Sequence, residues 1–316
     1  MKITPSLIEA FLKCPTKCWL RSHGELGSGN AYADWVQTQY ESYRSEGVRR
    51  LLEGIPLDDC AIAPPEPVNL KTAKWRLAAD LAAQAASPAR SSSILLPKKC
   101  PVTGSAADAK PEASQPVGRM PAPNPQTGPC ILESRLHAVE REPSESRGKP
   151  ARFIPIRLVF PNRFTRDDKL LLAFDALVMS NMLGHEIRLG KIIHGDDHAT
   201  LKVKTSALAS DALKRTEKII TLLAGNSPPD LVLNRHCAEC EFQGRCRQKA
   251  MEVDDLSLLS AMTEKERSRH RSKGIFTVNQ LSYTFRPRRT PKRAKNPAKP
   301  HYLALQALSI RENTVH

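Results

Sequence analysis

The sequence predicts an α+β protein in which a small mixed sheet is flanked by helices. Apolar residues alternate along residues 131–140 and 152–160, as in strands, and recur at helical spacing along residues 31–52 and 166–183. Strands and helices therefore share one middle region. With 40% hydrophobic and 26% charged residues in a chain of 316, the protein is long enough to bury a core and has a globular composition.

The first elements are predicted to be helices. Thr4-Pro5-Ser6 precedes apolar residues at helical spacing, which predicts a helix with Ser6 as N-cap and Glu9 in the capping box, ending near Cys14. Residues 31–52 and 71–86 are predicted to be the second and third helices. From residue 86 to 129, Pro, Ala and Ser dominate and aromatic residues are missing, so this stretch is expected to be a disordered insertion.

The remaining elements alternate between strand and helix. Residues 131–140 and 152–160 are predicted strands, and Pro155 places the second of them at a sheet edge or a bulge because proline has no N–H for the ladder. A strongly apolar helix, a strand pair around Gly195 and an amphipathic helix follow in turn at residues 166–183, 187–204 and 206–223.

Three cysteines close together indicate a metal site. Cys237, Cys240 and Cys246 form a C-x2-C-x5-C pattern in a polar loop that has little to pack against. A fully ligated zinc or iron–sulfur site usually takes four protein ligands. Buried free cysteines are the simpler alternative, but a third cysteine at close spacing favours a metal.

The fourth ligand has three candidates. Cys14 and Cys18 form a tight pair near the N-terminus, and His236 stands beside the cysteine array. If Cys14 closes the site, the metal closes a loop of about 220 residues at a cost of about 5 kcal/mol. Structural zinc sites contribute roughly 10–16 kcal/mol, so such a metal can staple both ends of the domain together.

The chain is strongly basic, with a formal net charge of +15 and a pI near 9.6, which favours a polyanionic partner. Residues 286–299 hold seven Lys and Arg and no acid. The candidate nucleic-acid contacts are Arg286, Arg288, Arg289, Lys292 and Arg293. If all seven basic residues bound phosphates, the salt slope would approach about −6.

No apolar run approaches the ~20 residues that a membrane span needs. Glu9 and Lys13 interrupt the first helix, so no signal peptide is predicted. The eight cysteines suit a reducing compartment. A cytoplasmic protein without a membrane partner is expected.

Residues 251–285 are predicted to form a helical, helix–turn–helix-like segment. Gly274 and Thr277 precede a helix whose backbone N–H groups could face a phosphate, although a plain turn is an equal alternative.

The order of these parts resembles the RecB-like nucleases of the PD-(D/E)XK superfamily that carry an iron–sulfur cluster and continue into an RNase H-like domain. The matching blocks are S-L-I-E-A-F-L-K-C-P-T-K-C-W-L, L-N-R-H-C-A-E-C-E-F-Q-G-R-C-R-Q-K-A, D-D-L-S-L-L and G-I-F-T-V-N-Q-L-S-Y-T-F-R-P-R-R. The resemblance implies a 4Fe-4S cluster held by Cys14, Cys237, Cys240 and Cys246, with Cys14 at the C-P-x-K position. Zinc remains the alternative.

The resemblance also implies a nuclease centre, in which an acid on one strand and an acid-x-Lys on the next hold Mg²⁺ and water. The first strand offers Glu133, His137 and Glu140. On the second strand, Arg157 and Val159 stand where an acid and a lysine belong. In the expected Gln-x3-Tyr helix, Leu171 and Asp175 replace the motif. No catalytic residue is therefore assigned, and the restriction-endonuclease-like core is interpreted as degenerate, with Mg²⁺ expected only if Glu140 and Asp175 recruit it.

Three domains are expected. Residues 1–250 form the nuclease-type domain, 251–285 the helical segment, and 286–316 a basic linker and the start of a missing C-terminal domain. The leading hypothesis is a nuclease-derived DNA-binding module in DNA processing or repair. The alternatives are an active nuclease with unusual ligands and a zinc-bound scaffold protein.

Overall fold

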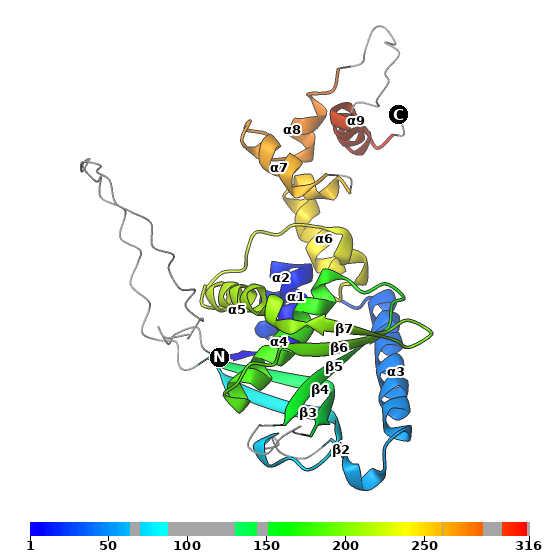
Figure 1. Cartoon of the computed structure of the whole chain (residues 1–316). Helices are drawn as coiled ribbons and strands as arrows, with labels where there is room; N and C mark the ends of the chain where they lie inside the picture. Colours follow the sequence, from blue (N-terminus) through cyan, green and yellow to red (C-terminus); the bar gives the residue numbers. More distant parts are fainter. Residues whose placement is uncertain (64–69, 88–129, 144–150, 261, 287–298, 315–316) are drawn as a thin grey trace, which may run out of the picture.

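The structure is a computed structural model that describes residues 1–63, 70–87, 130–143, 151–260, 262–286 and 299–314 (Figure 1). The predicted insertion at 86–129 lies outside this part of the chain, except for its first two residues. The strands are β1 Lys2–Ile3, β2 Cys60–Ile62, β3 Leu77–Ala86, β4 Ile131–Glu142, β5 Arg152–Val159, β6 Leu189–His194 and β7 Ala199–Lys204. The α-helices are α1 Pro5–Lys13, α2 Pro15–Ser22, α3 Ala31–Glu53, α4 Arg166–Leu183, α5 Ala209–Leu223, α6 Gln243–Glu252, α7 Glu264–Arg271, α8 Val278–Ser282 and α9 Lys299–Glu312.

The strands form one mixed sheet, which confirms the predicted α+β class. Its order is β2-β3-β4-β5-β6-β7, with β1 pairing beside β4. β3, β4 and β5 run antiparallel, whereas β6 lies parallel to β5 and is reached through α4. β6 and β7 form a hairpin at Gly195, whose φ of +71° suits glycine.

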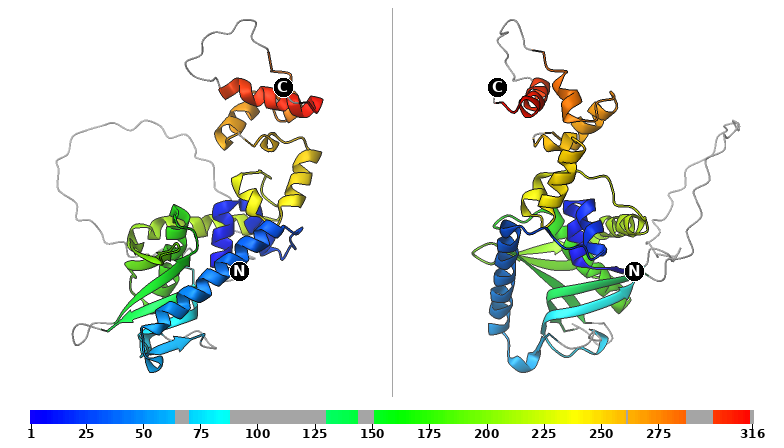
Figure 2. Two further views of the ribbon diagram at one scale, coloured as in Figure 1. Left: turned by 90° about the vertical axis from the view of Figure 1, so that its right-hand side faces the viewer. Right: turned by 180° about the vertical axis from the view of Figure 1, so that it is seen from behind.

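Helices cover both faces of the sheet (Figure 2). On one face, α4 packs across the central strands, and α1 and α5 pack against α4. Phe174 and Met179 of α4 are fully buried in this larger core. On the other face, α3 lies against a smaller cluster that includes Leu158. The close approach of α3 requires Gly47, because an added Cβ would come within 2.6 Å of the Leu158 side chain.

The predicted third helix is wrong: β3 occupies Leu77–Ala86. Its alanines favour a helix intrinsically, but the strand is paired on both sides, with β2 and β4, and its first three residues are buried. Tertiary packing therefore overrides propensity. Within β3, Asp80 has a φ of +52°, and the inward-facing residues change sides there, from Leu77 on the α3 face to Leu81 on the α4 face.

Two smaller expectations are also corrected. Thr4, not Ser6, caps α1, since its side chain accepts the N–H of Leu7 and Pro5 begins the helix. β5 is an interior strand and not an edge strand. Pro155 is tolerated there because pairing with β6 begins only at Ile156, one residue after the missing N–H.

After α6 comes the C-terminal lobe, the name used here for residues 254–314. The structure describes residues 254–260, 262–286 and 299–314 of the lobe, and these form a helical cluster separate from the sheet (Figure 1). The described residues of the lobe share a small core of their own, built from Leu256, Leu259, Val278, Leu281, Leu303 and Ala307. The lobe joins α6 directly, because the N–H of Asp255 bonds the carbonyl of Ala250. None of the described helices combines the length and apolar character needed to cross a membrane.

Candidate metal centre and nucleic-acid interface

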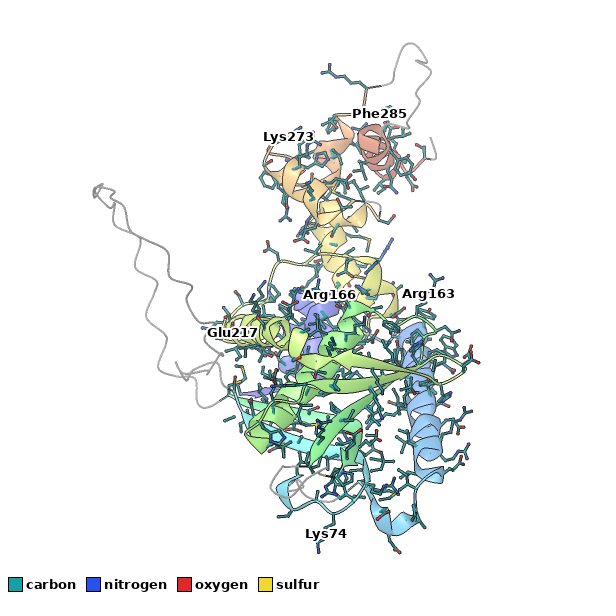
Figure 3. All side chains as sticks on the ribbon, viewed as in Figure 1. Lys74, Arg163, Arg166, Glu217, Lys273 and Phe285 are labelled. Carbon is teal, nitrogen blue, oxygen red and sulfur yellow. The ribbon has the colours of Figure 1, made fainter. Side chains whose placement is uncertain are left out.

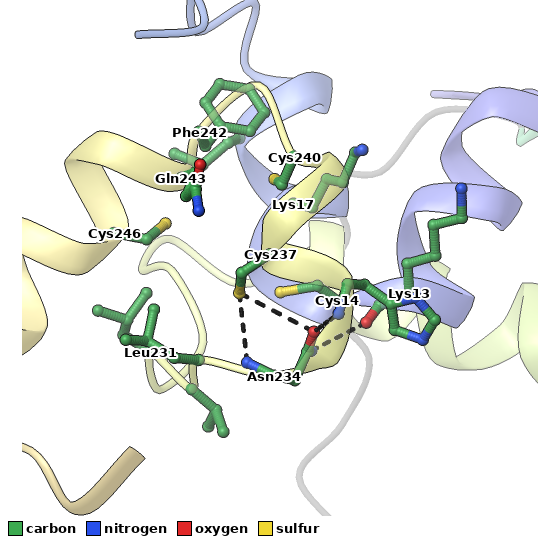
Figure 4. Close-up of a pocket in the computed structure, with 14 residues that line it drawn as sticks. Lys13, Cys14, Lys17, Leu231, Asn234, Cys237, Cys240, Phe242, Gln243 and Cys246 are labelled. Carbon is green, nitrogen blue, oxygen red and sulfur yellow. Dashed lines mark hydrogen bonds between the residues drawn. The ribbon is translucent and has the colours of Figure 1, made fainter. Parts of the chain in front are cut away.

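The four predicted cysteine ligands line one cavity (Figure 4). Cys14 comes from the junction of α1 and α2, Cys237 and Cys240 from the short helix Arg235–Glu239 and its C-cap, and Cys246 from α6. His236 and Lys17 line the same cavity. The tertiary structure thus brings both ends of the sheet domain to the place where the sequence predicts a metal.

The start of α2 fixes the position of Cys14. Pro15 occupies the first turn of α2, so the helix begins there and leaves Cys14 in extended backbone, with its side chain free of capping bonds. Cys18, one turn later, is fully buried in the main core and does not line the cavity. Burial raises the pKa of the Cys18 thiol to about 12. Of the two N-terminal cysteines, only Cys14 is placed to share a metal with the loop.

The cysteine loop is held by Asn234. Its backbone N–H donates to the sulfur of Cys237 at 3.2 Å, and its side-chain amide donates to the carbonyl of Lys13 at 3.0 Å. Donors of this kind stabilise a thiolate. Burial raises the pKa of Cys237 and Cys240, and raises that of Cys246 to about 11. A cation in the cavity would offset this cost, because metal-bound thiols are deprotonated.

The ends of the domain are also joined without a metal. The Glu241 carboxylate accepts from Lys17 at 2.8 Å and from Arg21 at 2.6 Å. These cations, working against burial, lower the pKa of Glu241 to about 2. Asn30, the N-cap of α3, donates to the carbonyl of Ala238 at 2.9 Å. The contacts imply that the fold survives metal loss, though with lower stability.

The residue types and their common position around one cavity suit a metal site, but the side chains are too far apart to hold a metal in this structure. Four sulfurs border one cavity of about 20 Å³, which has room for one water or ion. Within the described ranges, no three His, Cys, Asp or Glu side chains converge closely enough to hold a metal. Binding would therefore have to draw the sulfurs inward around one ion, or move the loop outward around a larger cluster.

At the position on β5 where the family resemblance expects an acid, Arg157 forms a buried ion pair with Asp175 of α4. Arg157 of β5 donates to one carboxylate oxygen of Asp175 on α4 at 3.0 Å, and Ser134 of β4 donates to the other at 2.5 Å. Arg157 and Asp175 are only 8% and 2% exposed. Burial raises the pKa of Asp175, opposed by Arg157 and Ser134. Both oxygens are thus committed to protein donors.

The other candidate acids are engaged as well. Glu140 forms an ion pair with Lys191 of β6, and Glu133 pairs with Lys2 at 3.1 Å. Asp80, which the sequence interpretation overlooked, pairs with Arg44 of α3. Asp80 has a left-handed backbone conformation in the middle of β3. The surrounding alanine-rich sequence contains no signal that predicts this conformation.

His137 gives this region a pH dependence. Its ring Nδ1 accepts the N–H of Leu158 at 3.1 Å, and burial beside Arg157 and Arg44 lowers its pKa well below 6.5. Below pH 6.5, His137 therefore binds a proton in the unfolded chain but remains unprotonated in the folded protein until a lower pH is reached. The resulting stability is present above pH 6.5 and is lost as the pH falls below it, by at most about 1.4 kcal/mol per pH unit.

We expect His137→Asn to reduce the loss of unfolding free energy between pH 6.5 and 5, because asparagine can accept the same N–H without titrating. Denaturant melts at several pH values measure the slope. His23→Asn, at an exposed position, is the control and should keep the wild-type slope. An identical slope in both variants would show that His137 titrates normally.

Of the predicted nucleic-acid contacts, the structure describes Arg286, which is exposed. Arg288, Arg289, Lys292 and Arg293 lie outside the described residues. The C-terminal lobe as a whole contains thirteen Lys and Arg against five Asp and Glu, a formal charge of +8 out of +15 for the chain. Figure 3 shows Lys273 and Phe285 on this lobe, at the opposite end of the molecule from Lys74.

The predicted turn before α8 exists, but its N–H groups are already used. Gln280 accepts the backbone N–H groups of Phe276 and Thr277, and Thr277 in turn accepts from Gln280. Asp254 accepts from Val278 and Asn279. The junction is therefore a self-contained helix cap in a five-residue helix, and it leaves no donors for a phosphate.

Comparison with known proteins adds little. No known protein family matches the sequence, and none of the curated proteins is similar to it. Among solved structures, the crystal structure of SSO0001 is 13% identical over 78% of this chain and 86% of that chain, with a TM-score of 0.39. A likeness this low carries no argument about fold or function.

Proposed function

We propose that the protein is a nuclease-derived DNA-binding module whose domain ends are joined by a cysteine-held metal group, and whose own nuclease centre is degenerate. The metal part rests on one observation: Cys14, Cys237, Cys240 and Cys246 line a single cavity although more than 200 residues separate the first from the others. The family resemblance favours a 4Fe-4S cluster in this place.

The residues around the cavity have defined roles. The four cysteines would hold the group, which when bound would supply a structural crosslink. Asn234 directs an N–H at one sulfur, and Lys17 lines the cavity beside the sulfurs while paired with Glu241. Cys246 lies in the first turn of α6, the helix that leads to the C-terminal lobe. The crosslink would therefore fix the lobe relative to the sheet.

The binding part rests on the charge of the C-terminal lobe. A net charge of +8 on a fifth of the chain favours the phosphate backbone of DNA as partner, because released counterions drive such binding. Phe276 and Tyr283 of the same lobe are exposed and offer apolar contact to bases.

The degenerate centre is supported by the Arg157–Asp175 pair. A guanidinium on β5 brings a positive charge to the position where Mg²⁺ would need carboxylates. Glu140 retains one carboxylate, but Lys191 neutralises it. A single paired carboxylate is a poor site for a divalent ion.

One assay tests the DNA-binding part of the proposal and the degenerate nuclease centre. Labelled duplex DNA is titrated with the protein in excess Mg²⁺ and read by anisotropy and by denaturing gel. We expect saturable, salt-dependent binding without cleavage, and the same result for Glu140→Ala. Mg²⁺-dependent cleavage that Glu140→Ala abolishes would overturn the degenerate centre, and absence of binding would overturn the partner.

A zinc-bound scaffold protein is the second candidate. It is favoured by the small volume of the cavity and by His236, which lines it beside the cysteines. Burial lowers the pKa of His236 and keeps it neutral, as a ligand must be. Metal content separates the two proposals.

A further inference from the structure

Arg267, on α7, is a buried arginine for which the described residues supply no partner. It is 9% exposed, its Nη1 atom is buried without a hydrogen bond, and no described carboxylate forms an ion pair with it. Burying an unpaired guanidinium costs several kcal/mol, so proteins normally match it with an anion. An anion is therefore expected to bind Arg267.

No described acid of the lobe forms an ion pair with Arg267: Glu264 is exposed, and Glu312 pairs with Arg311. Asp255 accepts the N–H of Ser257 at 2.7 Å and Nη2 of Arg271 at 3.1 Å. Glu266 caps α7 through Thr263, and Asp254 accepts from the start of α8. The stretch 286–299 contains no acid at all. The missing anion must therefore come from outside this part of the chain.

Two other residues of the lobe, Arg271 and Ser257, also have one buried donor atom each without a partner among the described residues. Arg271 follows Arg267 by one helical turn, so the two arginines share a face of α7. The Nε atom of Arg271 and the hydroxyl of Ser257 are both buried and have no hydrogen-bond partner among the described residues. The backbone N–H of Ser257 and Nη2 of Arg271 donate to the same Asp255 carboxylate, which places the two residues side by side, and Nη1 of Arg271 lies 3.8 Å from the carboxylate of Asp230. An oxyanion here would meet two guanidinium groups and one hydroxyl.

We propose that Arg267, Arg271 and Ser257 form a phosphate-binding site in the C-terminal lobe. Phosphate fits better than carboxylate because its additional oxygens can accept from all three donors, and the forked guanidinium matches its geometry. This deepens the proposed function: the phosphate would be one of the DNA backbone. The site gives the lobe a fixed point of contact that the turn before α8 does not provide.

Inorganic phosphate tests the site itself. Thermal unfolding of the full chain is followed in phosphate and in chloride of equal ionic strength. We expect phosphate to raise the wild-type Tm by about 3–5 °C and Arg267→Met to abolish that rise. In chloride, the variant should be at least as stable as the wild type, because an apolar chain of similar length replaces an unpaired charge.

Arg269→Met is the matched control, since it removes the same charge from an exposed position of α7. It should keep the phosphate-dependent rise. A wild type that responds equally to both salts would overturn the site, and so would an Arg267→Met variant that retains the full response. An Arg267→Met variant that is less stable in chloride would show that Arg267 already has a partner.

Competition identifies the source of the phosphate. At equal ionic strength, phosphate should displace labelled duplex DNA more than chloride does, and Arg267→Met should remove this difference and reduce the salt slope by about 1. If phosphate raises the Tm without displacing DNA, the site stands and its ligand is a small phosphorylated compound. If the chain binds no DNA, the proposed function fails while the Tm experiment still tests the site.

Discussion

Protein purified without oxygen is expected to contain about four iron atoms per chain and to absorb visible light, and Cys237→Ser is expected to lose both. The physical reason is the single cavity lined by Cys14, Cys237, Cys240 and Cys246. Removing one thiolate from a four-ligand set would leave the group with three protein ligands, and we expect such a group to be lost during purification. Metal analysis and an absorption spectrum measure both effects.

Stability should fall together with iron. The proposed metal crosslink would span about 220 residues, but Glu241 with Lys17 and Arg21 holds the same two segments without it. We therefore expect Cys237→Ser to remain folded and to lose roughly 5–10 °C in Tm, which for a domain of this size corresponds to a few kcal/mol. Calorimetry of the anaerobic protein gives the value.

Two further cysteine variants identify the fourth ligand. Cys14→Ser should lose the colour, whereas Cys18→Ser should keep it, because Cys18 lies in the core away from the cavity. Cys60→Ser, on the edge strand β2, is the neutral control. One zinc per chain without colour would remove the cluster and favour the scaffold. No metal in protein handled without chelators would remove both.

Replacing Arg286, Arg288, Arg289, Lys292 and Arg293 with alanine is expected to weaken DNA binding and to flatten its salt dependence. Each phosphate contact contributes about 0.9 to the slope of log K against log salt, so the five together contribute up to about 4.5. Fluorescence anisotropy with duplex DNA at four or more salt concentrations gives the slope. An unchanged slope would show that this stretch is only a solvated linker.

A matched variant distinguishes DNA contact by the basic stretch from a general effect of the protein's net charge. Lys202, Lys204, Lys214, Arg215 and Lys218 are exposed on β7 and α5, and no described ion pair involves them. Their replacement by alanine removes the same five charges from the sheet domain. The control should keep most of the slope. If both variants lose the slope equally, DNA binding depends on net charge and not on the basic stretch.

Much of the fold, and the clustering of the late cysteines, could be predicted because both depend on local pattern. The apolar alternation along β4 and β5 and the helical periodicity along α3 and α4 match the elements observed, because each element must turn one apolar face to the core. The cysteine spacing predicted ligands that are close in sequence. The resemblance already favoured Cys14 over Cys18, and the structure adds that Cys14 lines the cavity whereas Cys18 is buried in the core.

The sequence by itself thus determined the α+β class, the position of most elements, the cysteine set and the uneven charge. Only the tertiary structure decided that the alanine-rich β3 is a strand paired on both sides, that Arg157 and Asp175 neutralise each other, and that Glu241 binds Lys17 and Arg21. It alone revealed Arg267 as a buried charge without a partner. Burial and pairing depend on residues far apart in the chain, and local propensity contains no information about them.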